Sequence, residues 1–254
     1  MDDFFPQGHI GMLFSGMEEH ETICRFESYL DYGVPSSNLG GVTENKMMIN
    51  NIDIIKPLLN FTEEGDFYML YVFKRKKDQP EGDRDNHQSV RTIKTYCIDS
   101  LEYLDKRYDE IKQLCEMFKA RAYIHIQKQN HKDVSLEMMM SLAQKIKDGQ
   151  HVQKNLFDSV VGQLKTNEKR WIIDVDNISI DGFNHSPSQI EMREFINELQ
   201  KEAGREPHMT FIKTKSGFHI ITQPFNVMKF KERYPQIDIQ KKNPTLMYYP
   251  SSLD

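Results

Sequence analysis

Residues 171–177 read WIIDVDN, an apolar run that ends in acids and predicts a short buried strand over Trp171–Val175. In a strand, side chains two positions apart point to the same face, so we expect Asp174 and Asp176 to project together. Two carboxylates this close repel each other unless a cation lies between them, and Mg²⁺ or Mn²⁺ held by both carboxylates and by substrate phosphates is the usual arrangement. The alternative is a strand end whose acids face water, and the motif alone favours neither interpretation.

A second motif follows at residues 213–225, KTKSGFHIITQPF, which predicts two apolar strands joined by a tight Ser-Gly turn. A small turn lets backbone N–H groups approach a phosphate, and Lys213 and Lys215 beside Ser216 would supply positive charge. His219 lies on one face of the second strand, where an imidazole can donate a hydrogen bond to a phosphate or exchange protons. Taken alone, the motif is explained better by an ordinary hairpin with a half-buried histidine.

A third acid, Asp238, stands between two isoleucines in residues 236–240, QIDIQ. An acid with apolar neighbours in a strand either lies on the solvent-exposed face or belongs to a functional site, so this motif alone is weak evidence for a site. Signatures of other chemistries are absent from the sequence, which contains no GxSxG, GxxxxGK[ST], HExxH or GxGxxG pattern. Its three cysteines form no CxxC pair, which argues against a cysteine-based zinc site.

The rest of the chain alternates between strand-like and helix-like patterns. Ser100 predicts the N-cap of a long amphipathic helix, and Ser188 with Glu191 predicts a capping box. The expected strands are Phe67–Lys74, Val90–Ile98, Ala120–Lys128, Met209–Ile212, Phe218–Thr222, Ile237–Gln240 and Leu246–Tyr249, and the other expected helices are Met48–Leu59, 152–166 and Asn226–Tyr234.

A further helix is expected to open at Asp133 or Ser135 and to stop at Gly149. One of its faces carries Leu136, Met139, Met140 and Ala143. Methionine fills irregular gaps between packed elements, so this stripe predicts core packing in preference to a cofactor site.

From residue 169 onward, the order strand, helix, hairpin, helix, strand resembles a ferredoxin-like or palm arrangement, in which helices cover one face of an antiparallel sheet. The predicted fold class is therefore α+β, with this RRM/ferredoxin-like palm beside a smaller α/β layer. We expect residues 1–60 to form an N-terminal arm or strap, residues 61–168 the smaller α/β subdomain, and residues 169–254 the palm-like catalytic subdomain. Together they would make one compact catalytic unit.

Composition narrows the class of protein. The chain of 254 residues is 38% apolar and 28% charged, with a mean hydropathy of -0.64, which is typical of a soluble globular protein. No apolar run approaches the roughly 20 residues that cross a bilayer, and the first residues lack a secretory signal, so we expect a cytoplasmic protein without a membrane partner. Residues 201–250 hold nine Lys and Arg against four Asp and Glu in a chain of net charge -5, which permits an anionic ligand.

The order of the three motifs resembles that of the archaeo-eukaryotic primase superfamily, in a minimal form of the phage or plasmid type that would act in the host cytoplasm. The resemblance covers residues 170–250 and implies two-metal nucleotidyl transfer. It implies that Asp174, Asp176 and Asp238 hold two Mg²⁺ or Mn²⁺ ions. It implies that Ser216, His219 and Lys213 or Lys215 bind the triphosphate. Arg121 alternates with Tyr123 and His125 along one expected strand, so the three share a face that is a candidate for the same cleft.

The resemblance implies a DNA primase or primase-polymerase that joins NTPs or dNTPs on a single-stranded DNA template, with replication proteins as candidate partners. The template would lie along the basic C-terminal portion, where Phe218, Tyr248 or Tyr249 are available for stacking. Two alternatives stay open. One is a metal-dependent nuclease or phosphodiesterase that uses the same carboxylates. The other is a non-catalytic or degenerate module that binds nucleotide or nucleic acid.

Overall fold

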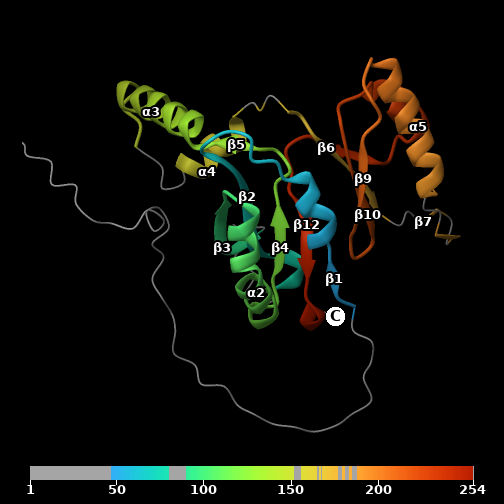
Figure 1. The fold of residues 1–254 in the computed structure, drawn as a ribbon, viewed down its shortest axis with the longest axis horizontal. Coiled ribbons are helices and arrows are strands. Elements are labelled where there is room, and N and C mark those ends of the chain that lie inside the picture. The colour runs from blue at the N-terminus through green and yellow to red at the C-terminus, as the bar shows by residue number, and fades with distance from the viewer. Residues whose placement is uncertain are drawn as a thin grey trace, which may run out of the picture. The chain divides into compact units, whose positions relative to one another are not determined.

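The computed structural model describes residues 47–79, 90–151, 156–164, 166, 168–176, 179–180, 183–184 and 188–253. These residues belong to one compact unit, Thr43–Asp254. The fold is α+β, and every strand pair in the described ranges is antiparallel (Figure 1). Of the arm expected over residues 1–60, residues 1–46 lie outside the described residues.

The first sheet has six strands in the order β1-β12-β4-β2-β3, with β5 paired to β2. Long strands rich in aromatic and β-branched residues form its centre, where Phe67, Leu70 and Val72 are buried. The strands are β1 (Ile49–Asn50), β2 (Asp66–Arg75), β3 (Val90–Ile98), β4 (Arg121–Ile124), β5 (Gln129–Asn130) and β12 (Thr245–Tyr249).

The second sheet has four strands in the order β11-β6-β10-β9. They are β6 (Trp171–Asp176), β9 (Met209–Lys213), β10 (Gly217–Thr222) and β11 (Asp238–Gln240). The WIIDVDN strand therefore lies inside this sheet, between the QIDIQ strand and the KSGFHI strand. A separate two-stranded ribbon pairs β7 (Ser179–Ile180) with β8 (Phe183–Asn184).

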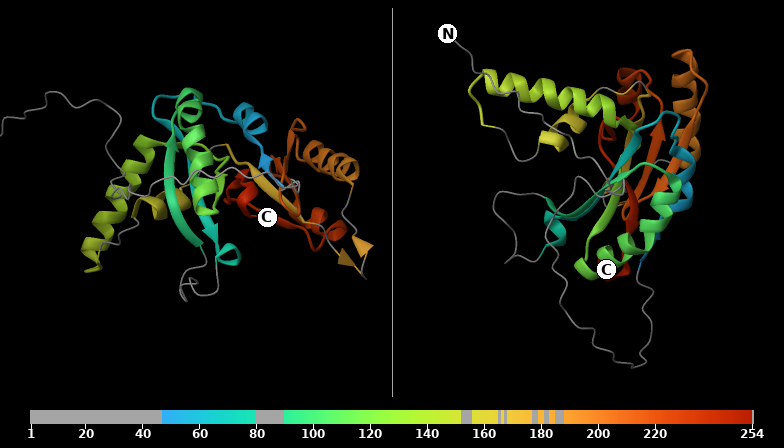
Figure 2. Two further views of the ribbon diagram at one scale, coloured as in Figure 1. Left: turned by 90° about the horizontal axis from the view of Figure 1, so that it is seen from below. Right: turned by 60° about the vertical axis from the view of Figure 1, so that its left-hand side comes forward.

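Two of the helices that lie beside these sheets begin at predicted serine caps (Figure 2 shows the helices). The side chain of Ser100 accepts a hydrogen bond from the Tyr103 backbone N–H, and the side chain of Ser188 accepts one from that of Glu191, so both predicted N-caps are confirmed. The helices are α1 (Ile52–Ile55), α2 (Leu101–Phe118), α3 (His131–Lys147), α4 (Leu156–Gln163), α5 (Gln189–Glu202) and α6 (Val227–Arg233), with 3-10 turns at Lys56–Leu58, Lys76–Asp78 and Ser251–Leu253.

Strand alternation assigns the two faces of the second sheet to different cores. Ile173 and Val175 on one face pack with residues of α5 and α6. Ile172, Ile212 and Ile221 on the opposite face belong to the cluster that includes α2 and the first sheet. The second sheet is therefore covered by helices on one face and by the first sheet on the other, and Asp174 shares the face of Ile172.

The first core and the strand pairing cross the expected subdomain boundaries at both ends. Residues 49–59 belong to the fold, because Ile52, Ile55 and Leu58 are buried in the first core, and they form a strand, a short helix and a 3-10 turn in place of one helix. β12 leaves the second sheet and pairs with β1 and β4 in the first. The apolar run TLMYY suits either sheet, and only long-range pairing decides between them.

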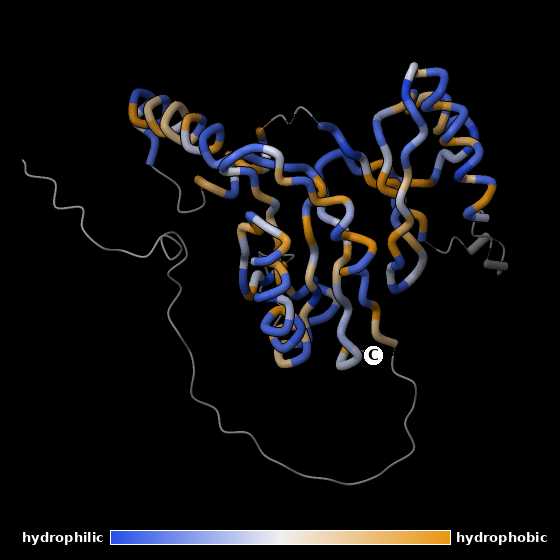
Figure 3. The backbone as a smooth tube through the Cα atoms, in the orientation of Figure 1, coloured by the Kyte–Doolittle hydropathy of each residue, from blue (hydrophilic) through white to orange (hydrophobic). Residues whose placement is uncertain are grey.

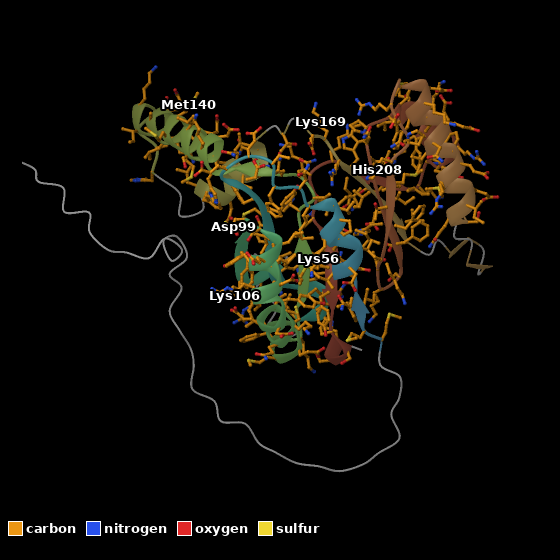
Figure 4. All side chains as sticks on the ribbon, in the orientation of Figure 1. Lys56, Asp99, Lys106, Met140, Lys169 and His208 are labelled. Atoms are coloured by element: carbon orange, nitrogen blue, oxygen red, sulfur yellow. The ribbon has the colours of Figure 1, made fainter. Side chains whose placement is uncertain are left out.

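The Met-rich stripe is also placed wrongly by the sequence. The helix begins at His131, because Asn130 caps it, and its stripe faces away from the sheets (Figure 4 labels Met140). Met139 and Met140 are 68% and 65% exposed, whereas Val134 on the other side of α3 is buried. Apolar and polar residues accordingly alternate along α3 in Figure 3. The expected strand Ala120–Lys128 is shorter as well, since β4 ends at Ile124.

Candidate functional site

A cleft of about 500 Å³ lies between the two sheets. Asp174, Asp176 and His219 line it from the second sheet, together with the turn at residues 214–216. Strands β2 and β4 of the first sheet line the opposite side with Phe73, Arg75, Arg121 and Tyr123. One wall of the cleft is thus acidic, and the other is basic and aromatic.

Three polar residues form a row across the second sheet. Asp174 on β6 is directly opposite His219 on β10 and directly opposite Asp238 on β11. Opposed residues of an antiparallel pair point to the same face, so all three share the face that meets the first sheet. Asp176 lies two positions further along β6, on the same face, opposite Gly217, where β10 begins.

Hydrogen bonds fix the Asp174 carboxylate in this row. Its Oδ1 lies 3.3 Å from His219 Nε2, and its Oδ2 accepts a hydrogen bond of 3.1 Å from the Gln240 side chain. The hydrogen bond with His219 lowers the pKa of Asp174 below its usual value, against the effect of burial, and the positive charge of Arg75 adds to the lowering. Asp174 therefore carries a negative charge into the cleft near neutral pH.

His219 is held from both sides. Its Nδ1 lies 2.9 Å from the Oγ1 of Thr245, which is fully buried on β12 of the first sheet. If Nε2 donates to Asp174, Nδ1 is the acceptor and the Thr245 hydroxyl donates to it. The imidazole thereby connects the two sheets at the floor of the cleft.

The Ser-Gly turn approaches β6 more closely than any side chain permits. A Cβ atom added at Gly217 would lie 1.9 Å from the Val175 carbonyl oxygen. The Thr214 N–H donates to the Gly217 carbonyl and closes the turn at 3.0 Å. Glycine at this position therefore brings Lys215 and Ser216 beside Asp176.

Two cleft-lining cations, one from each sheet, lie against one aromatic ring. The Arg121 guanidinium and the Lys215 ammonium lie 4.9 and 5.1 Å from the centre of the buried Tyr249 ring, and Lys215 also donates to the Tyr249 hydroxyl. Arg121 forms an ion pair with Asp78, with 2.6 Å between Nη2 and Oδ1. Beside these residues, the rings of Phe73 and Tyr123 stack with centroids 4.8 Å apart.

The fold brings most of the predicted site residues together. Arg121 and Tyr123 come from the first sheet, and the others come from the second. The predicted residues that line the cleft are Arg121, Tyr123, Asp174, Asp176, Lys215, Ser216 and His219.

Other predicted residues lie elsewhere. Lys213 is opposite Phe218, so its side chain is on the helix-covered face of the second sheet. Asp238 shares the row of Asp174 but is exposed and does not line the cleft. His125 lines a separate small cavity with Met69 and Lys242. These differences follow from strand register, which a motif does not specify.

The three aromatic residues expected to stack on a template are all buried. Phe218 packs in the core under α5 and α6, and Tyr248 donates a hydrogen bond to Glu116. Tyr249 is fully buried below the two cations described above. The half-buried ring of Phe73 lines the cleft instead, with the buried Tyr123 stacked against it.

Several residues of the site escaped the motif analysis: Phe73, Arg75 and Gln240, which line the cleft, and Thr245, which contacts His219 from behind it. The sequence FYMLYVFKR does carry a signal for the first two. Phe73 and Arg75 are two positions apart in this strand, so they share a face, opposite to that of the buried Val72. Thr245 carries no local signal, because its role depends on the pairing of β12 with the first sheet.

The carboxylates of the cleft fit a divalent cation whose remaining ligands come from water and a substrate. Among the described residues, no group of three or more His, Cys, Asp and Glu side chains is arranged to hold a metal ion. Asp174 and Asp176 nevertheless present two carboxylates from one face of β6 to one cleft. Two carboxylates completed by water and substrate phosphates are a typical Mg²⁺ site.

Comparisons of the chain with protein-family models, curated proteins and solved structures found no match. Within the described ranges, no helix combines the length and the apolar character that crossing a bilayer requires.

Proposed function

We propose that the cleft binds a nucleoside triphosphate and transfers its nucleotidyl group to a growing strand on a single-stranded DNA template, as a primase or primase-polymerase does. One observation carries this proposal: an acid pair on one wall faces cations and stacked aromatic rings on the other, across a volume of about 500 Å³. In fold terms, the second sheet with α5 and α6 would be the primase-type palm.

Each wall has a role in this proposal. Asp174 and Asp176 would hold Mg²⁺ or Mn²⁺, with Asp238 beside them as the ligand proposed for a second ion, and a bound ion of this kind activates a hydroxyl and stabilises a leaving phosphate. Lys215 and Arg121 would bind the phosphates through charge-assisted hydrogen bonds. The half-buried Phe73, held by the stacked Tyr123 ring, would offer a face for a base.

His219 would hold a proton on its Nε2, between Asp174 and the bound substrate. With Thr245 donating to Nδ1, the Nε2–H points to Asp174 and can be shared with a phosphate oxygen that enters the cleft. Gln240 orients the other oxygen of the same carboxylate. Both contacts fix the position of the Asp174 carboxylate before substrate binds. A site with preorganised charges lowers the activation free energy, because its groups need not reorganise during the reaction.

The test is strand synthesis by the full chain, with Mn²⁺ or Mg²⁺, labelled NTPs or dNTPs and single-stranded DNA, with and without a primer. We expect products that lengthen with time in the wild type and that disappear in Asp174→Asn/Asp176→Asn. Asp109→Asn is the matched control, because this acid is 82% exposed on α2 and does not line the cleft. DNA that shortens in place of lengthening would instead show a nuclease or phosphodiesterase.

A second candidate is a nucleotide-binding module without catalysis. It is favoured by the contacts of Asp174, whose two oxygens already lie within hydrogen-bonding distance of His219 and Gln240. Triphosphate binding without products under all these conditions, and unchanged binding in the double variant, would select this candidate over the polymerase.

A further inference from the structure

Arg121 and Asp78 form a buried ion pair at the basic wall of the cleft. Their side chains are 4% and 9% exposed, and one contact of 2.6 Å joins Nη2 to Oδ1. Arg121 is on β4, at the centre of the first sheet, whereas Asp78 ends the single 3-10 turn that follows β2. A central strand positions its side chain firmly, and a one-turn segment does so less firmly, so Asp78 is the more easily moved partner.

The pair leaves hydrogen-bonding groups on both partners unused. Arg121 Nε and Asp78 Oδ2 are both buried, and neither has a hydrogen-bond partner. A guanidinium and a carboxylate normally pair through two parallel hydrogen bonds, and buried polar atoms are normally satisfied. Arg121 lines the cleft, and its Nε–H is a donor that its present anion does not satisfy.

The surroundings of Arg121 suit an anion larger than one carboxylate. Lys215 lies against the same Tyr249 ring, and Arg75 and Lys76 line the same cleft. A phosphate group offers three oxygens and about two negative charges, so it can use donors that a single carboxylate oxygen leaves empty.

We propose that Arg121 is the centre of an anion subsite that Asp78 occupies in this structure, and that a phosphate group of the ligand displaces Asp78 from it. That the phosphate belongs to a nucleotide rests on the proposed function. The exchange keeps Arg121 paired at all times, which avoids an uncompensated buried charge before and after binding. Asp78 is then a competitor for the site that weakens phosphate binding.

Pyrophosphate binding to the full chain tests the exchange, without template or divalent cation. If Asp78 holds Arg121 in nine-tenths of the molecules, its removal raises the apparent affinity about tenfold. We therefore expect Asp78→Asn to bind pyrophosphate about tenfold more tightly than the wild type in calorimetry. Asp105→Asn is the matched control, because it removes one negative charge from an exposed pair with Lys56 outside the cleft.

The gain in affinity must depend on Arg121. In the double variant Asp78→Asn/Arg121→Gln, the gain should vanish, which a double-mutant cycle measures as coupling between the two positions. Equal or weaker binding by Asp78→Asn would overturn the proposal and make Asp78 a positioning residue for Arg121. So would a gain that persists in the double variant or that Asp105→Asn reproduces.

A measurement on the wild type covers the case in which Asp78→Asn does not fold. The Arg121 Nε–H signal, assigned by its loss in Arg121→Lys, should shift when pyrophosphate is added, because a phosphate oxygen becomes its acceptor. An unchanged signal at saturating pyrophosphate would overturn the proposal. Neither readout requires turnover, so the exchange can hold where strand synthesis fails, and synthesis can occur where the exchange fails.

Discussion

Gly217 stands where the KSGFHI hairpin approaches the strand of the two acids most closely. An alanine Cβ would lie 1.9 Å from the Val175 carbonyl, a contact that only a backbone shift can relieve. We expect Gly217→Ala to lower the free energy of unfolding by about 3 kcal/mol, at the upper end for overpacking. Urea denaturation measures this, with Gly149→Ala as a comparison, where no atom lies within 4 Å but φ is positive. A loss at Gly217 no larger than at Gly149 would contradict the close approach.

The Thr245 hydroxyl is a second single group on which the site depends, because it contacts His219. Thr245→Val leaves the buried His219 Nδ1 without its partner, which should cost about 2 kcal/mol of unfolding free energy. Thr245→Ser keeps the hydroxyl and should lose only about 0.8 kcal/mol for the missing methyl group. Chemical denaturation of both variants decides the matter. A Thr245→Val variant as stable as the wild type would show that the hydrogen bond to His219 does not contribute.

At the scale of elements, α3 shows how a periodic pattern can be assigned to the wrong environment. Because Met139 is exposed, Met139→Gln should change the unfolding free energy by no more than about 0.5 kcal/mol. Val134 is buried against residues of β2 and α4, so Val134→Ala should cost roughly 2 kcal/mol. Denaturant midpoints compare the two variants directly. An equal loss of unfolding free energy in the two variants would show that the Met stripe packs in the core.

The junction of β2 and β5 gives a pH dependence at the same scale. Burial raises the pKa of Asp66, but hydrogen bonds from Lys128, the Glu63 backbone N–H and Asn130 outweigh it and lower the pKa to about 2. The folded pKa is below the unfolded value of 3.8, so this stabilisation is complete above that pH and is lost as pH falls toward about 2. Asp66→Asn should therefore flatten the fall of stability across this window. Parallel curves for the variant and the wild type would refute the assignment.

At the scale of the whole described unit, one buried amide joins the two walls of the cleft. Asn51 Nδ2 donates to the Lys213 carbonyl at 2.9 Å and to the Leu246 carbonyl at 3.0 Å, so it bridges β9 of the second sheet and β12 of the first. Asn51 is 2% exposed. Its bridge acts together with the His219–Thr245 and Lys215–Tyr249 contacts, which cross between the same sheets.

Asn51→Ala should consequently cost about 2 kcal/mol of unfolding free energy, since two carbonyls lose a donor. It should also weaken pyrophosphate binding, because the two walls lose a connection. The matched control is Asn60→Ala, whose side chain is exposed and should be replaceable within about 0.5 kcal/mol. Thermal unfolding and calorimetry on both variants report the two effects. If Asn51→Ala were as stable as Asn60→Ala, the Asn51 bridge would not stabilise the fold.

The sequence by itself determined the local features. Alternation and β-branched runs specify β2, β3, β6 and the β9–β10 hairpin, Ser100 and Ser188 specify two helix starts, and the period of a strand places Asp174 and Asp176 on one face. These features depend on neighbours within a few positions, where backbone sterics and capping hydrogen bonds act.

Only the tertiary structure decided which surfaces meet. It put β12 into the first sheet, turned the Met stripe of α3 outward, buried Tyr249 beneath Arg121 and Lys215, and set Phe73 and Arg75 opposite the acids. The physical reason is that an apolar run or an amphipathic face is compatible with several partners. The choice among them depends on register and packing between segments far apart in the chain, which no local pattern encodes.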